Sequence, residues 1–296
     1  MHKGIFIYGD GSNIFTLLGF LNGVREKIRE VMVWNSCGVS ALILFFKVLG
    51  YNYRQIFDLI KDFELISSMI NGSSLLIEDE SEKKNYIKNW LTFHLDQNGF
   101  LNTDSTLLEI FNRQKFFLNF MLWSKNKQDI ITANANTNPD MTLVDCVMAS
   151  LCGIGIYSQY TIDDNVFSNS LAINPVPVEK VFNSVDNIDI KTLYILNKKH
   201  YNFNFGKKFN SPLIQIENEI LKQNNELNNY LVEKILKENN DEDFIKMYSY
   251  FSRGKIIIDE KETMYNLGSN QGNFIIQEKD TYDAYINHIT YIENQS

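Results

Sequence analysis

Cysteine is scarce in this chain, and its cysteines form no ligand set. Cys37, Cys146 and Cys152 are odd in number and lack the spacing of a metal site. Disulfide-rich frameworks belong to secreted proteins, whereas unpaired thiols persist in reducing compartments. The sequence therefore predicts no metal, no cofactor and a reducing intracellular location, the cytoplasm.

Positive charge and long apolar runs are also in short supply. Lys and Arg total 28 against 36 Asp and Glu, which gives a net charge of −8. A general nucleic-acid binder needs a basic stripe to displace counterions, so nucleic acid is not an expected partner. No apolar run reaches the ~18–20 residues that span a bilayer, and the N-terminal segment lacks a signal-peptide core. We therefore expect neither a transmembrane segment nor a secretory leader.

Proline is rare as well, with 4 residues, while Asn, Ile, Lys, Tyr and Phe are abundant. This composition is typical of an AT-rich genome, such as that of a virus or an AT-rich microbe. A viral protein would act in the host cytoplasm. The 296 residues, 44% of them apolar, suffice for one large domain. Because no repeat or linker is evident, we expect a single domain over 1–296.

Strand and helix patterns alternate along the chain. Two repeats of strand, glycine-containing turn and helix are predicted first, at 5–8, 9–13 and 14–28, then at 30–34, 36–40 and 41–49. Further on we predict helical structure over 53–98 with a polar break at 78–84, strands at 116–123, 129–133 and 190–196, a helix at 212–237, a strand at 255–259 and a helix at 282–291. This order is typical of an α/β protein with a parallel sheet.

The first turn holds a degraded glycine motif. It reads Gly9-Asp10-Gly11-Ser12-Asn13-Ile14, and Gly19-Phe20-Leu21 follows in the helix. The segment resembles the patatin-like phospholipases, serine lipid acyl hydrolases with a Ser–Asp dyad, whose G-G-G-x-[RK]-G loop stabilises the oxyanion and precedes a G-V-L. The resemblance implies an oxyanion-loop remnant made of Gly9, Asp10, Gly11 and Asn13, with Asn13 replacing the basic residue.

The second turn resembles the nucleophile elbow of the same family, G-x-S-x-G-A-L between a strand and a helix. It reads Ser36-Cys37-Gly38-Val39-Ser40-Ala41-Leu42. The family's spacing, counted back from Leu49-Gly50-Tyr51 or forward from the glycine loop, reaches Gly38 both times. The resemblance implies that Gly38 occupies the nucleophile position.

Two serines remain as alternative nucleophiles. Ser36 would fit if Ser36-Cys37-Gly38 were the second half of G-x-S-x-G, and Ser40 is the other hydroxyl in the turn. The Ser36 register needs compensating shifts on both sides and puts Trp34 where a small residue belongs.

The catalytic aspartate is replaced in the third motif. Residues 138–152 read N-P-D-M-T-L-V-D-C-V-M-A-S-L-C and resemble the family segment T-P-D-M-x-V-x-D-A-V-x-x-S. The ungapped continuation places the family's D-G-G turn at Asn169-Ser170-Leu171. Because an asparagine amide has no usable basicity, the resemblance implies that the general base is lost at Asn169. Asp163 and Asp164 remain as alternative acids, although this pair is typical of a solvated hairpin turn.

The resemblance implies an α/β, three-layer patatin-like fold with a mainly parallel central sheet and helices on both faces. Motifs support it over 4–178, and strand–helix order completes it over 179–296. The losses at Gly38, Asn169 and Asn13 indicate a pseudoenzyme, kept as a binding, structural or regulatory module for a protein partner or a lipid surface.

Other functions remain open at this stage. The main alternative is an active serine lipid acyl hydrolase of phospholipase A type that uses Ser36 or Ser40 with a nearby Asp. A third is a regulatory subunit of an active homologue, and the sequence is compatible with a homo-oligomer. Lipid binding requires an open family cleft, whereas a scaffold role is favoured if the cleft is filled by the replacements Ile14, Trp34, Ser170 and Leu171.

Overall fold

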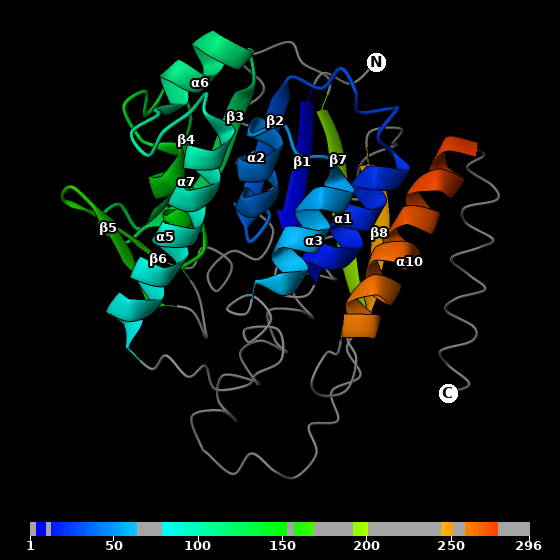
Figure 1. Ribbon diagram of the computed structural model, residues 1–296. Coiled ribbons are helices and arrows are strands. Elements are labelled where there is room, and N and C mark those ends of the chain that lie inside the picture. The colour runs from blue at the N-terminus through cyan, green and yellow to red at the C-terminus, as the bar shows by residue number, and fades with distance from the viewer. Residues whose placement is uncertain are drawn as a thin grey trace.

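A mixed, eight-stranded sheet forms the centre of the protein, with strand order β5-β6-β3-β2-β1-β7-β8 and with β4 beside β3 (Figure 1). The computed structural model describes residues 4–9, 13–63, 79–152, 157–168, 192–200, 244–250 and 258–277. The strands are β1 (Gly4–Gly9), β2 (Val33–Gly38), β3 (Phe117–Ser124), β4 (Asp129–Ala133), β5 (Tyr160–Ile162), β6 (Asn165–Ser168), β7 (Thr192–His200) and β8 (Phe244–Tyr250).

The centre of the sheet is parallel and one edge is antiparallel. β1 pairs in parallel with β2 and β7, β2 with β3, and β7 with β8. β4 and β6 pair antiparallel with β3, and β5 with β6. The sheet is therefore mixed, and the α/β prediction is confirmed while its parallel character is limited to the centre.

Helices line the sheet, and Figure 1 shows α1, α2, α3, α5 and α7 in front of it. The helices are α1 (Asn13–Gly23), α2 (Ala41–Val48), α3 (Tyr53–Asp62), α5 (Glu80–Asn98), α6 (Leu107–Gln114), α7 (Leu143–Ser150) and α10 (Ile258–Gln277). Local signals mark several helix starts. Asn52 and Gln55 form a capping box at α3, as Thr106 and Glu109 do at α6. None of the helices in the described part of the chain combines the length and apolarity that a membrane-spanning segment needs.

Several predicted boundaries are wrong. The first helix ends at Gly23 instead of residue 28, and residues 24–31 continue as short hydrogen-bonded turns. The second strand covers Val33–Gly38 instead of 30–34, so it includes part of the predicted turn. The predicted strand at 255–259 is wrong at its end, because Ile258 and Asp259 open α10, while residues 255–257 lie outside the described residues. The predicted helices at 212–237 and 282–291 lie outside the described residues.

The core follows the alternation of side chains along the strands. Ile5 and Ile7 of β1, Trp34 of β2 and Phe120 of β3 join the helices in one buried apolar cluster. Intervening residues point to the opposite face of the sheet. Several of these are also fully buried, namely Phe6, Cys37 and Met121. Both faces of the sheet are therefore shielded from solvent.

α1 and α10 pack with their backbones in direct contact. Gly19 on α1 has no room for a Cβ because it would overlap the carbonyl oxygen of Tyr265, and a Cβ at Gly268 would overlap that of Thr16. Gly23 and Gly272 continue the same contact one turn on. Four glycines thus join the N-terminal helix to a helix near the other end of the chain.

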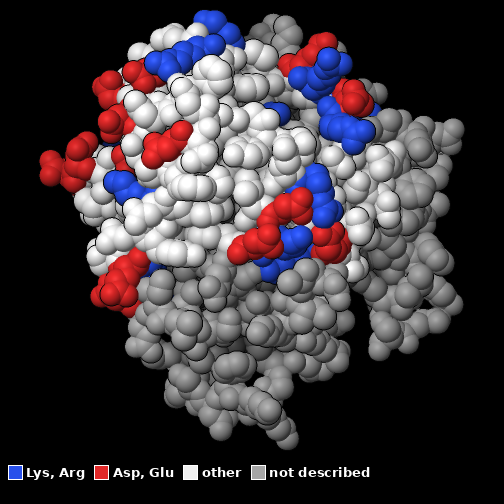
Figure 2. Space-filling view, viewed as in Figure 1, with Lys and Arg blue, Asp and Glu red and all other residues white. Residues whose placement is uncertain are grey.

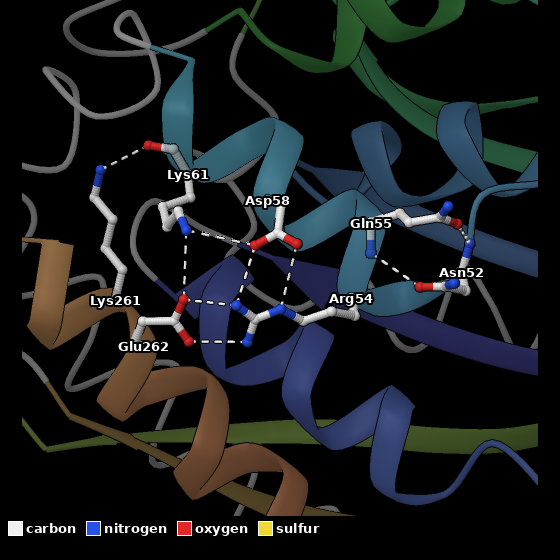
Figure 3. A network of polar contacts seen from close by, with 7 residues as sticks. All are labelled: Asn52, Arg54, Gln55, Asp58, Lys61, Lys261 and Glu262. Carbon is white, nitrogen blue, oxygen red and sulfur yellow. Dashed lines mark hydrogen bonds and ion pairs between the residues drawn. The ribbon is translucent and has the colours of Figure 1, made fainter.

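An ion-pair cluster joins α10 to α3. It lies within the group of red and blue side chains over these helices in Figure 2. In the close view of Figure 3, the Arg54 guanidinium donates to both oxygens of Glu262 at 2.7 and 2.9 Å. Lys61 bridges Asp58 and Glu262, and Lys261 donates to the backbone carbonyl of Lys61 at 2.9 Å. The last described helix is therefore fixed from two sides.

Candidate functional site

The turn between β2 and α2 places a glycine at its strained position. β2 ends at Gly38, whose φ is 67°, and α2 begins at Ala41. Nucleophile elbows hold their reactive residue in such a strained strand-to-helix turn. A residue without a side chain occupies this point because left-handed backbone favours glycine.

The Ser40 hydroxyl forms hydrogen bonds within the turn and to β1. Its Oγ accepts a hydrogen bond from the backbone N–H of Cys37 at 3.2 Å. Its own proton is shared by the carbonyl oxygens of Cys37, at 2.8 Å, and of Ile7, at 3.1 Å. The residue is fully buried. Its hydroxyl therefore ties the elbow to β1 and does not face a substrate.

Ser36 lies inside the strand and not in the turn. It pairs with Ile7 of β1 and with Phe120 of β3 and is fully buried. Its Oγ has no hydrogen-bond partner within the described part of the chain. The predicted turn at 36–40 is wrong at its start, because β2 is held in ladders on both sides as far as Cys37.

The glycine loop leaves the sheet beside the elbow. Gly9, the last residue of β1, is the register partner of Gly38. Asn13 begins α1, whereas Asp10, Gly11 and Ser12 lie outside the described residues. The two turns that carry the sequence resemblance thus start from adjacent positions at the carboxyl ends of parallel strands.

β6 lies on the same edge of β3 as β2. Phe120 of β3 pairs with both β2 and β4, so these two strands occupy opposite edges of β3. Trp123 pairs with both β4 and β6. β6 must therefore share the edge of β2.

The last residue of β6 pairs with β3 just beyond the point where the pairing of β2 with β3 ends. The last β2 partner on β3 in the register is Met121, and Ser168, the last residue of β6, pairs with Trp123 just beyond it. Asn169 follows Ser168 in the sequence and lies outside the described residues, as do Ser170 and Leu171. The strand that precedes the expected base position thus ends next to the elbow.

The alternative acids lie elsewhere. Asp163 and Asp164 form the exposed tip of the β5–β6 hairpin, and Asp163 has a φ of 50°. The predicted hairpin turn is confirmed. Because β6 runs from this tip to Ser168, both carboxylates stand at the far end of the strand from the elbow.

Trp34 does not reach the elbow either. It is the second residue of β2, about 13 Å from Gly38 along an extended strand. Its indole donates to the carbonyl oxygen of Val31 at 3.1 Å, and Lys47 lies over its ring. The expectation that Trp34 contributes to filling the cleft is wrong, because its ring packs at the other end of β2. Ile14 is fully buried in the core.

The thiols of Cys146 and Cys152 are not poised as nucleophiles. Burial raises the pKa of the Cys152 thiol to about 12 and that of Cys146 well above its usual value. Both therefore stay protonated at neutral pH. No cluster of three or more His, Cys, Asp or Glu side chains with metal-binding geometry occurs among the described residues.

Sequence reasoning missed a buried amide ladder across the sheet. Asn119 donates to the side-chain oxygen of Asn35, and Asn134 to that of Asn119, each at 2.9 Å. Asn35 in turn donates to the carbonyl oxygen of Ile5 at 3.0 Å. Only the strand register aligns these residues, so no local pattern could have predicted the ladder. The ladder links β1, β2 and β3 through Asn35, which precedes the elbow in β2.

The sequence matches no known protein-family profile and no curated protein. The fold, however, is an α/β fold with a mixed, partly parallel sheet that resembles patatin-like structures. VipD from Legionella pneumophila matches with a TM-score of 0.52 at 10% identity, over 96% of this chain and 67% of VipD. The type III effector protein ExoU matches over 95% of this chain and 53% of its own, at 10% identity and a TM-score of 0.47, which is too low to establish a shared fold.

The likeness to VipD confirms the expected patatin-like resemblance at the level of the fold. Function has to be argued from the site, because one fold hosts many activities.

Proposed function

We propose that this chain is a catalytically inactive patatin-like protein that serves as a binding module. The observation that carries the proposal is Gly38, which stands at the strained end of β2 with a φ of 67° and offers no hydroxyl. The serines on either side cannot replace it in this geometry. Ser36 is buried inside a paired strand, and the Ser40 hydroxyl is engaged by the backbone.

Asn169 as the degenerate base position is part of this proposal. Its support is the register of β6, whose last residue, Ser168, pairs with Trp123 beyond the end of β2. Asparagine cannot take the proton of a nucleophile, and Asp163 and Asp164 lie at the opposite end of β6. Asn13, at the start of α1, takes the place of the basic residue of the oxyanion loop in the same proposal.

A single three-layer domain with helices on both faces of the sheet completes the proposal. It is supported by the burial of Phe6, Cys37 and Met121 on the face opposite α1 and α2. The buried cysteines Cys37, Cys146 and Cys152 form no disulfide, which favours action in a reducing compartment.

Acyl-ester hydrolysis by the purified protein tests the proposal. We expect no turnover of phospholipid or nitrophenyl-ester substrates above the rate without protein, and no labelling by a serine-directed fluorophosphonate. Ser36→Ala is the matched control, because the hydroxyl that it removes has no partner in the described residues. Hydrolysis that is blocked by the fluorophosphonate or lost in Ser36→Ala would establish an active hydrolase instead.

A further inference from the structure

α5 carries apolar side chains on two faces. One face is buried in the core through Ile87, Leu91, His94 and Leu95. A second row, here called the outer seam, consists of Tyr86, Trp90, Phe93 and Phe100. Tyr86, Phe93 and Phe100 expose 42%, 57% and 78% of their surface, although a helix with a single core contact would place polar residues there.

The outer seam has the spacing of a helix–helix contact. Its helical residues Tyr86, Trp90 and Phe93 follow one another at intervals of four and three, and Gln97 fills the next position of the 4–3 pattern. Apolar residues repeating at alternate intervals of three and four form the line along which one helix packs against another. Phe100 lies just past the C-cap, Gly99, whose φ of 72° ends the helix, and is exposed as well. The exposed row therefore fits the side of a second helix.

Neighbouring rings hold the outer seam in place. Phe63, at the end of α3, stacks on Trp90 with a centroid distance of 3.9 Å and on Tyr86 with one of 5.5 Å. Phe93 meets His94 edge to face at 5.4 Å. Rigid aromatic side chains lose little entropy on binding and are the commonest energetic anchors of interfaces.

Two carboxylates lie on the exposed flank of the outer seam. Glu82, Asn89 and Asp96 follow one another at seven-residue intervals beside it, and all three are exposed. On the face shown in Figure 2, an area with few charged side chains separates the left edge, which carries mostly red and some blue side chains, from the cluster over α3 and α10. A second copy of this flank, or an anionic lipid surface, would meet charge of the same sign. A basic flank on the partner would be attracted.

We propose that the outer seam binds an amphipathic α-helix of another protein, with an apolar 3–4 row and a flank of Lys or Arg. This inference rests on the binding role proposed above but does not depend on the loss of catalysis. Tyr86, Trp90 and Phe93 form the contact, and Glu82 and Asp96 select the charge of the partner.

Two synthetic helical peptides of about three heptads test the proposal. Both carry leucine at the seam positions, and their flanks carry Lys in one peptide and Glu in the other. Calorimetric titration of the full chain should give micromolar binding of the Lys peptide, about ten-fold or more tighter than that of the Glu peptide. Phe93→Ala should weaken the Lys peptide about ten-fold or more.

Matched variants distinguish binding at the outer seam from nonspecific binding to exposed apolar residues. Met32→Ala removes another exposed apolar residue, which lies outside α5, and should leave binding unchanged. The double variant Glu82→Lys/Asp96→Lys should reverse the peptide preference, and circular dichroism confirms that each variant is folded. Equal binding of both peptides, or no binding, overturns the proposal.

Two further results would also overturn it. One is Phe93-dependent dimerisation of the protein in sedimentation velocity, and the other is Phe93-dependent binding to vesicles that contain phosphatidylserine. Ester hydrolysis would instead contradict the proposed loss of catalysis and leave the peptide result intact, so the two failures are distinguishable.

Discussion

The ring of Phe46 on α2 meets the imidazole of His94 on α5 edge to face, with their centroids 5.1 Å apart. Tyr51, Trp90 and Phe93 also contact the imidazole through their rings. His94 is buried, and burial lowers the pKa of its imidazole because the charged form is poorly solvated there. The aromatic contact between the two helices thus contains a titratable group.

The free energy of unfolding should fall as the pH is lowered below about 6.5, the ordinary histidine pKa. Between that pH and the lowered pKa of folded His94, the unfolded chain binds a proton that the folded chain does not. Stability from this group is therefore complete above about pH 6.5 and is lost towards lower pH. Urea unfolding at pH 7.5 and 5.5 measures the change.

His94→Phe is the control for this pH dependence. It keeps an aromatic ring in the cluster and removes the titration, while the other histidines, His2, His200 and His288, are retained. The variant should lose less stability than the wild type between the two pH values. An identical loss in both proteins would assign the pH dependence to other groups.

The two serines of the elbow should differ sharply on substitution. Ser40→Ala removes the acceptor of the Cys37 N–H and should cost about 1–3 kcal/mol in the free energy of unfolding. Ser36→Ala removes a buried hydroxyl without a partner in the described residues and should change stability by about 0.5 kcal/mol or less. Parallel urea titrations measure the free energy of unfolding of both variants. Equal losses would contradict the hydrogen bonds described for Ser40.

The glycines between α1 and α10 should not tolerate alanine. Gly19→Ala places a methyl group against the carbonyl of Tyr265 and should cost about 3 kcal/mol or more. Gly50→Ala is a matched comparison, because its Cβ would meet no atom within 4 Å and only its φ of 86° is strained. That variant should cost about 1–2 kcal/mol. If both substitutions cost the same, direct backbone packing of the two helices is disproved.

Glu262→Gln should reduce the acid sensitivity of the protein only slightly. The hydrogen bond from Arg54 lowers the pKa of Glu262, so its stabilising effect is present above the unfolded pKa of about 4.3 and is lost as the pH falls below it. Arg54 is nearly half exposed, so the pair should contribute about 1 kcal/mol or less. Unfolding of both proteins at pH 5 and pH 3 measures the difference, which 1 M NaCl should diminish. A larger acid loss in the variant would contradict this assignment.

Local patterns predicted much of the first half of the fold. The strand at 5–8, the helix that ends before Gly50 and the strand pair at 116–123 and 129–133 are all present within a residue or two. Each depends on signals within a short window, such as an apolar run or a glycine at a helix end. Elements fixed by distant partners were harder to predict. The Ile256-Ile257-Ile258 run indicated a strand, but Ile258 opens a helix that packs on α1.

At the candidate site, too, local sequence predicted some features, and others depend on distant residues. Spacing pointed to Gly38, and the structure places this glycine at a positive φ at the end of β2. The assignment of Gly38 as a former nucleophile position stays a prediction. The role of the Ser40 hydroxyl could not be predicted, because its acceptor on Ile7 lies on another strand. The assignment of Asn169 as the former base position also stays a prediction, because this residue lies outside the described residues.

The pairing of β1 with β7 joins parts of the chain that lie far apart in the sequence. Ile5 needs Leu193 as a register partner, and α1 needs α10 to cover its glycine face. Contacts between such distant residues are slow to form, because a long loop must close before they stabilise the chain. During synthesis β1 and α1 therefore lack these partners until β7 and α10 have been synthesised. Chaperones that bind apolar helix surfaces should act on this protein at that stage.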